Sequence, residues 1–97
     1  MLTVNKTTNW LTGEFTKEEL KIDKTLALIA AELRFKRINL GLNQKEFAKR
    51  LGVSQELVSR WESGTYNFTI TTLMKICDNL GLLFEPQMNQ IDVKEQV

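Results

Sequence analysis

The stretch from Gln44 to Ser63, QKEFAKRLGVSQELVSRWES, contains two short amphipathic segments separated by the tripeptide LGV. Gly52, at the centre of this tripeptide, can adopt the left-handed backbone conformation that commonly ends a helix. Ala48, four residues earlier, is small enough to let a second helix cross closely. The stretch therefore predicts two helices, at about 44–51 and 55–63, joined by a tight turn.

Similar start and stop signals predict further helices on both sides of this pair. Apolar residues recur at intervals of three and four over residues 26–33 and again over 73–80, as expected for helices that bury one face. We expect these additional helices at about 16–22, 24–39 and 70–80. Side chains that can cap a helix N-terminus precede four of the five segments: Thr16, Asn43, Ser54 and Thr69.

The sequence after Gly81 does not continue the helical pattern. The apolar run at 82–84 is followed closely by Pro86, so we expect a short edge strand or a packed extended arm there. The predicted architecture is all-α. It has five predicted helices, one in a helical N-terminal extension over 1–23 and four in a domain over 24–81, and it ends in an extended arm and flexible tail over 82–97.

The composition favours a small intracellular protein without catalytic or metal chemistry. The chain has 97 residues, no histidine and one cysteine. It therefore lacks the usual general base and metal ligand and cannot form an internal disulfide. The N-terminus has no signal-peptide core, and no apolar stretch is long enough to span a membrane. We expect a cytoplasmic protein that is not an enzyme and has no cofactor and no bound metal.

The net charge of +1 conceals a basic segment in the middle of the chain. Residues 34–60 carry seven Lys and Arg side chains but only two acidic ones, whereas both flanking parts are weakly acidic. A local excess of positive charge is what a surface facing phosphate groups needs. Because such a run is equally typical of a solvated helix face, it needs a second, independent signal.

The predicted helix at 55–63 supplies that signal. On a helical projection, Leu57, Val58 and Trp61 share one face. The opposite face is polar and consists of Gln55, Glu56, Ser59, Arg60 and Ser63. Amides, hydroxyls and a guanidinium are the groups that hydrogen-bond to base edges in the major groove of DNA. Together with the basic segment, this polar face predicts DNA binding.

Several blocks of the sequence resemble the phage repressor/Cro-like helix-turn-helix domains, often called the XRE family. The resemblance extends from about Leu26 to Leu83. It rests on blocks at Lys36–Ile38, Leu40–Gln44, Ala48, Leu51–Gln55, Val58–Gly64, Leu73–Ile76 and Leu80–Gly81. It implies a compact five-helix fold whose third helix enters the major groove, usually as a dimer on a palindromic operator in double-stranded DNA.

The resemblance also implies roles for individual residues. Base reading is implied for Gln55, Glu56, Ser59 and Arg60, with the glutamine suited to adenine and the arginine to guanine. Contacts with the DNA backbone are implied for Gln44, Lys45, Ser63, Thr65, Tyr66 and Asn67. Arg37 and Glu62 match a structural ion pair between the first and third helices of the family.

Some residues allow two interpretations. Glu56 would repel phosphate, yet it can accept a hydrogen bond from cytosine N4. Leu57 is more typical of partial core than of a contact with a thymine methyl. Phe68 stands where relatives commonly have proline, so the loop before the last helix could differ. Trp61 is expected in the core, and Cys77 is expected there rather than as a reactive thiol.

Two functions fit this sequence. The favoured one is a sequence-specific transcriptional regulator that represses by occluding a promoter. The alternative is an antitoxin, resembling the HigA type, that binds a toxin protein and represses its own operon. Trp10, with Leu11 and Phe15, either covers the domain, which we favour, or anchors a partner. We expect a homodimer, and the best candidates for its interface are Leu82, Leu83 and Phe84.

Overall fold

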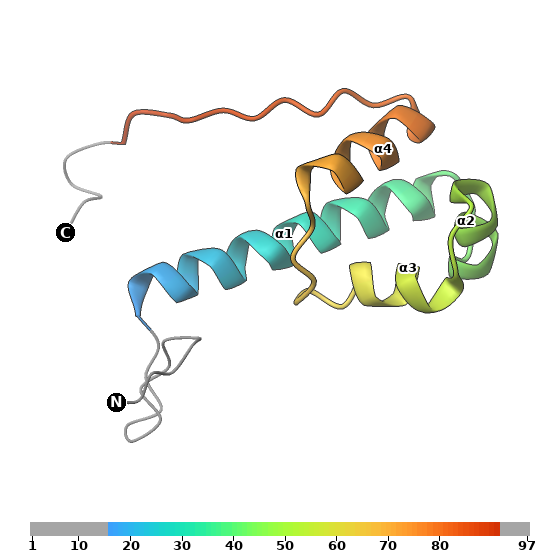
Figure 1. Ribbon diagram of the computed structural model, residues 1–97, viewed down its shortest axis with the longest axis horizontal. Coiled ribbons are helices and arrows are strands. Elements are labelled where there is room, and N and C mark those ends of the chain that lie inside the picture. The colour runs from blue at the N-terminus through green and yellow to red at the C-terminus, as the bar shows by residue number, and fades with distance from the viewer. Residues whose placement is uncertain (1–15, 92–97) are drawn as a thin grey trace, which may run out of the picture.

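The computed structural model describes residues 16–91 of the chain. The predictions for Trp10, Leu11 and Phe15 therefore lie outside the described residues, as does most of the tail. Four helices follow one another in the described part: α1 (Lys17–Asn39), α2 (Gln44–Leu51), α3 (Gln55–Trp61) and α4 (Ile70–Leu80). Figure 1 shows α1 crossing the molecule, with α2 at its C-terminal end and α3 and α4 on either side of it.

The prediction of two separate helices at 16–22 and 24–39 is wrong, because α1 is one continuous helix of 23 residues. It begins with the expected capping box: the backbone N–H of Glu19 donates to Thr16 Oγ1 at 3.1 Å, and the N–H of Thr16 donates to Glu19 Oε1 at 3.0 Å. No Pro or Gly follows to end the helix before residue 39. The described part therefore has four helices, not five, and no separate N-terminal helix.

The other helix boundaries follow their sequence signals closely. Asn43 and Glu46 form a second capping box at α2, with hydrogen bonds of 2.8 and 2.9 Å. Ser54 Oγ accepts from the N–H of Leu57 at 3.1 Å and caps α3. Gly52 ends α2 in the left-handed conformation, with φ at 72°. The C-terminus of α3 comes two residues before the predicted 63, since Glu62 already leaves the helical conformation.

One hydrophobic core joins all four helices. Phe47 and Val58 are completely buried, and Trp61 is 3% exposed, which confirms that it belongs to the core. Phe68 is also buried, so the position where relatives commonly have proline here supplies a core side chain. Cys77 is half-buried on α4, and burial raises the pKa of its thiol. The core cluster consists of Leu33, Phe47, Ala48, Val58, Trp61, Phe68 and Ile76.

Residues 82–91, called the arm below, leave α4 as an extended segment that runs back in the direction of the N-terminal end of α1 (Figure 1). It is fixed at its start, where the N–H of Leu82 donates to the carbonyl of Cys77 at 2.8 Å. Leu82 and Phe84 are half-buried, whereas Leu83 between them is 79% exposed. Of the two forms expected here, the structure has the extended arm, which is partly buried at Leu82 and Phe84 and exposed from Glu85 onward, and the described residues contain no strand.

Candidate nucleic-acid interface

The turn between α2 and α3 sets the position of the predicted reading helix. The N–H of Val53 donates to the carbonyl of Ala48 at 2.9 Å, which closes the turn over Gly52. Ala48 is only 3% exposed, so α3 packs closely against α2 at the small side chain that the sequence singled out. Because two helices joined by three residues bury a shared face, the orientation of α3 is fixed by packing.

The four predicted base-reading residues lie on the solvent side of α3. Gln55, Glu56, Ser59 and Arg60 are all exposed, while Val58 and Trp61 are buried on the opposite side. Leu57 is half-buried and packs against the core, as its partial-core interpretation predicts. The exposed face of α3 therefore presents an amide, a carboxylate, a hydroxyl and a guanidinium to any partner that approaches it.

The Arg60 guanidinium is partly positioned by an aromatic neighbour. Its Cζ atom lies 5.7 Å from the centroid of the Tyr66 ring, within the range of a cation–π contact. Tyr66 in turn meets Phe68 edge to face at 4.9 Å between ring centroids. Phe68 lies 6.1 Å from Trp61. The predicted base reader Arg60 is thus connected to the core through aromatic rings, which restricts its freedom.

The loop after α3 holds the predicted backbone-contact residues. Ser63 Oγ donates to the carbonyl of Arg60 at 2.7 Å and lies 3.1 Å from Thr65 Oγ1. The N–H of Thr65 donates to Ser63 Oγ at 3.3 Å. Ser63, Thr65 and Asn67 are exposed, and Tyr66 is half-buried. These short-range hydrogen bonds shape the loop, and its polar side chains come next in the chain after the exposed face of α3.

A buried polar network ties α1 to the end of α3. Arg37 Nε donates to Glu62 Oε2 at 2.7 Å and its Nη2 to Oε1 at 3.0 Å. Nη1 of the same guanidinium donates to the carbonyl of Leu42 at 2.8 Å. The two side chains are 10% and 4% exposed. Hydrogen bonding to Glu62 raises the pKa of Arg37, more than burial lowers it. The predicted structural ion pair is confirmed.

Gln44 joins the same network, which sequence reasoning missed. Its Nε2 donates to Glu62 Oε1 at 3.1 Å, and the side chain is half-buried at the first residue of α2. A glutamine amide nitrogen carries two hydrogens, so one remains for a phosphate oxygen. Lys45 beside it is exposed. No local pattern of residues signals this bond, because Gln44 and Glu62 are 18 residues apart in the chain.

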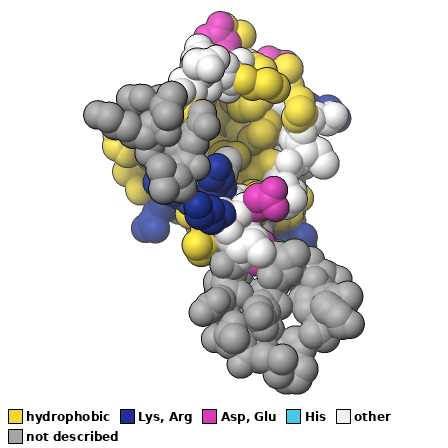
Figure 2. Space-filling view, turned by 90° about the vertical axis from the view of Figure 1, so that its left-hand side faces the viewer, with side chains coloured by type: hydrophobic (Ala, Val, Ile, Leu, Met, Phe, Trp, Pro, Cys, Tyr) yellow, Lys and Arg dark blue, Asp and Glu magenta, His cyan; other side chains and the backbone are white. Residues whose placement is uncertain are grey.

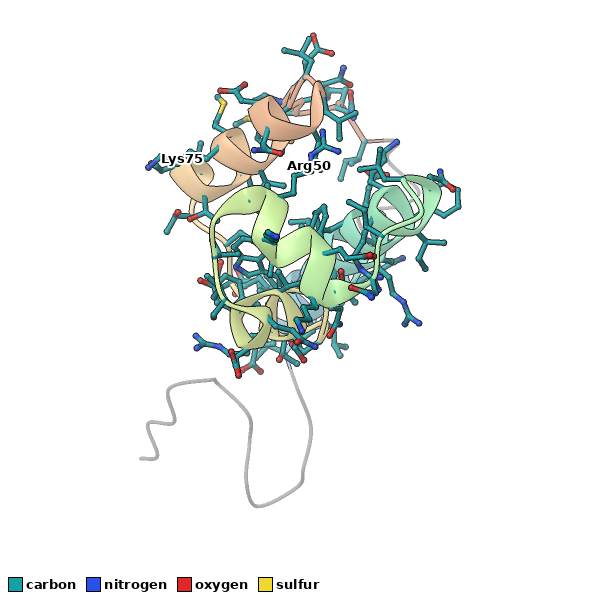
Figure 3. All side chains as sticks on the ribbon, turned by 90° about the vertical axis from the view of Figure 1, so that its right-hand side faces the viewer. Arg50 and Lys75 are labelled. Atoms are coloured by element: carbon teal, nitrogen blue, oxygen red, sulfur yellow. The ribbon has the colours of Figure 1, made fainter. Side chains whose placement is uncertain are left out.

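The cations of the basic segment, residues 34–60, differ in burial and in hydrogen-bond partners in the structure. Arg37 is buried in its ion pair, and Arg50 Nε and Nη2 donate to the side chain and backbone carbonyl of Asn79, each at 3.2 Å. Figure 3 shows Arg50 in the space between α2 and α4, whereas Lys75 on α4 extends away from the body. Five cations of the segment are exposed: Arg34, Lys45, Lys49, Arg50 and Arg60.

Residues 16–91 contain no group of three or more His, Cys, Asp or Glu side chains that could hold a metal ion. Over the same range, no helix has the length and apolar character needed to cross a membrane.

Comparison with known proteins agrees with this geometry. A helix-turn-helix family model matches residues 33–85. An uncharacterized HTH-type transcriptional regulator of Haemophilus influenzae is 33% identical over 76 residues, which are 75% of this chain and 78% of that protein. Antitoxin HipB of Escherichia coli is 35% identical over 54 residues, 56% of this chain and 61% of that protein.

A solved structure is also similar. The crystal structure of the hypothetical transcription factor NHTF from Neisseria has a TM-score of 0.55 and 29% sequence identity, and the match covers 60% of this chain and 67% of that one. The family model covers more than half of the chain, including the turn and both helices around it. The resemblance to the repressor-like domains is thereby confirmed, and the chain belongs to the helix-turn-helix family.

Proposed function

We propose that this protein is a sequence-specific regulator of transcription that binds double-stranded DNA and reads the major groove with α3. The observation that carries the proposal is the division of α3 into two faces. Val58 and Trp61 fix the helix in the core. Gln55, Ser59 and Arg60 are exposed on the other face, and they offer the hydrogen-bonding groups that distinguish base pairs.

Each exposed residue of α3 has a preferred partner in this arrangement. Gln55 can bond bidentately to adenine and Arg60 to guanine. The contact of Arg60 with Tyr66 favours this role, because a guanidinium that is already positioned loses less entropy when it binds. Ser59 can donate to or accept from either strand. Glu56 can accept from cytosine N4, and its charge keeps it away from phosphates.

The surroundings of α3 fit a contact with the DNA backbone. Gln44 and Lys45 lie at the N-terminus of α2, where backbone N–H groups are free to bind phosphate. The residues of the loop after α3 carry hydroxyl and amide groups: Ser63, Thr65, Tyr66 and Asn67. These contacts would set the register of the protein on the duplex, and α3 would supply the sequence specificity.

We further propose that the protein binds a palindromic operator as a homodimer and represses by occluding a promoter. One such domain buries too little DNA for tight specific binding, and paired half-sites about 34 Å apart remove this limit. The arm supports this proposal, because Leu83 presents a large apolar side chain to solvent. Light scattering at micromolar concentration tests it, and a monomer under those conditions would contradict it.

The decisive experiment selects bound sequences from a random DNA pool and then titrates the selected site and a scrambled site at one salt concentration. Gln55→Ala and Arg60→Ala should each lose about 1–3 kcal/mol of binding free energy on the selected site and little on the scrambled one. Lys75→Ala, which removes an exposed cation on α4, is the matched control. Equal losses on both DNAs would refute base reading by α3.

An antitoxin function is the second candidate. It is favoured by the 35% identity with antitoxin HipB and by the exposed apolar side chains of the arm, Leu83 and Met88. Exposed apolar side chains on an extended segment suit binding to another protein. A small toxin-like reading frame beside the coding sequence would support this function. Co-purification of its product with the wild type but not with Leu83→Ser would place the contact on the arm.

A further inference from the structure

An apolar groove runs between α1, α4 and the arm. It has a volume of about 440 Å³, and its apolar wall includes Ile29, Leu33, Leu73, Cys77 and Phe84. Figure 2, which views the molecule from the N-terminal end of α1, shows hydrophobic side chains gathered in this hollow. Binding sites for small molecules are concave and mostly apolar, and this groove lies within their usual range of volumes.

Three charged side chains also line the groove, and their charges sum to a negative value. Glu32 and Lys36 belong to α1, and Glu85 belongs to the arm. The two glutamates are exposed and Lys36 is half-buried, so the carboxylates can stay hydrated at the rim while their field acts on the apolar interior. The rim therefore favours a positively charged group over a negatively charged one.

The C-terminus of α4 makes the groove more electronegative. Leu80, the last residue of α4, lines the groove, and the C-terminus of a helix carries a partial negative charge. The last turn of α4 contains no basic side chain that would compensate this charge. The Cys77 thiol in the groove wall responds to its surroundings: burial raises its pKa most, and the negative charges of Asp78 and Glu32 raise the pKa further. The interior of the groove is thus both apolar and electronegative.

We propose that the groove binds a small organic cation, in which an apolar body carries one ammonium group. The body lies against the apolar wall, and the ammonium group stays at the hydrated rim in the field of Glu32 and Glu85. An organic anion of the same shape meets two carboxylates there and is repelled. Because α1, α4 and the arm bound the groove on three sides, it suits a small molecule better than the surface of a second copy. This binding does not depend on the proposed DNA binding.

The first test compares decylammonium with decanoate, which have the same chain length and opposite charges. Each is titrated calorimetrically into the full-length protein at neutral pH and one salt concentration. Decylammonium should bind about tenfold more tightly than decanoate, because the apolar contacts are shared and only the electrostatic contribution differs. Equal affinities would overturn the proposal, and so would the absence of decylammonium binding up to millimolar concentration.

Substitutions at the rim locate the bound cation. Glu32→Gln and Glu85→Gln each remove one charge with little change in shape, and each should weaken decylammonium binding about threefold. Lys36→Gln should strengthen it by a similar factor. Glu56→Gln, which changes an exposed glutamate on α3 outside the groove, is the matched control. Far-UV circular dichroism confirms that each variant is helical. If the rim variants change the affinity no more than Glu56→Gln does, the cation binds elsewhere and the proposal is wrong.

Cys77 measures the potential inside the groove, because it is the single cysteine of the chain and lines the groove wall. Its labelling rates with a cationic and an anionic methanethiosulfonate are compared as a ratio, in which the reactivity of the thiol cancels. This ratio should exceed that of mercaptoethanol, a neutral thiol, about threefold, and Glu32→Gln should lower it. A ratio equal to that of mercaptoethanol would contradict an electronegative groove and overturn the proposal.

Alkylation of Cys77 tests whether the cation occupies the groove itself. N-ethylmaleimide attached to this thiol fills part of the groove, so it should abolish decylammonium binding to the otherwise unchanged protein. Undiminished binding to the alkylated protein would refute the proposed site. A Cys77 labelling rate that falls as the protein concentration rises would show that a second copy covers the groove, and would refute the proposal as well.

Discussion

The two faces of α3 carry different kinds of side chain for different purposes, although the helix has only seven residues. One face holds Val58, which is completely buried, and Trp61, at 3% exposure. The other holds Gln55, Ser59 and Arg60, all in solvent. Stability should therefore depend on the first face and DNA recognition on the second, so that substitutions on this one helix can separate folding from binding.

The largest expected effect is on the buried face. Trp61→Ala removes an indole from the centre of the core and leaves a cavity, which should cost about 3–5 kcal/mol of the free energy of unfolding. Small domains have only about 5–15 kcal/mol in total. Urea denaturation followed by circular dichroism measures the loss, with Ser59→Ala, on the exposed face, as control. A loss below about 1 kcal/mol would show that Trp61 is not a core residue.

The ion pair that fixes the end of α3 should come next. Arg37→Ala leaves the Glu62 carboxylate, 4% exposed, with Gln44 as its one remaining side-chain partner among the described residues. Removing one partner of a buried pair costs about 3 kcal/mol or more, because an uncompensated charge stays buried. Arg34→Ala, an exposed arginine on the same helix, should change stability little in the same denaturation experiment.

A double substitution tests this reason for the loss. In Arg37→Met/Glu62→Leu both charges are replaced by apolar side chains, and such replacements are often neutral. The double variant should therefore be more stable than Arg37→Ala alone. If it is equally unstable, the contribution of the network comes from its specific bonds, such as the one from Arg37 to the carbonyl of Leu42, and not from charge compensation.

Most of the fold around α3 could be predicted from the sequence because its signals are local. Asn43 and Ser54 cap the helices that they precede, and Gly52 ends α2 at the position where a left-handed residue was expected. The helix break predicted before residue 24 has no such local signal in the sequence. With no Gly or Pro near Asp23, nothing in the sequence interrupts the helix, and α1 continues through it.

The candidate interface could be predicted only in part. Helical periodicity identified the exposed residues of α3, because position around a helix depends on spacing alone. The contacts that restrain them were not visible. Arg60 meets Tyr66 only because the loop bends back, and Gln44 reaches Glu62, 18 residues later in the chain, through the packing of α2 on α3. Such contacts depend on tertiary structure, which a pattern of residue types does not specify.

Ser54, the N-cap residue of α3, should have an intermediate effect on the free energy of unfolding. Ser54→Ala removes the oxygen that accepts from the N–H of Leu57, and the loss of an N-cap typically costs about 1 kcal/mol of unfolding free energy. Denaturation measures this, and Ser54→Asp should restore most of the stability because aspartate also caps helices. If Ser54→Ala is as stable as the wild type, the capping bond to Leu57 does not contribute to stability.

The smallest effect on stability, and the most informative one, is expected on the exposed face. Gln55→Ala should change the free energy of unfolding by less than about 0.5 kcal/mol, because an exposed side chain without described partners contributes little. The same substitution should weaken binding to the selected DNA site by about 1–3 kcal/mol. Denaturation and DNA titration of one protein preparation measure separately what the exposed face of α3 contributes to stability and to DNA binding. If Gln55→Ala loses stability and affinity in parallel, then its effect on DNA binding comes from disturbed folding, and the division of α3 into a structural face and a reading face is wrong.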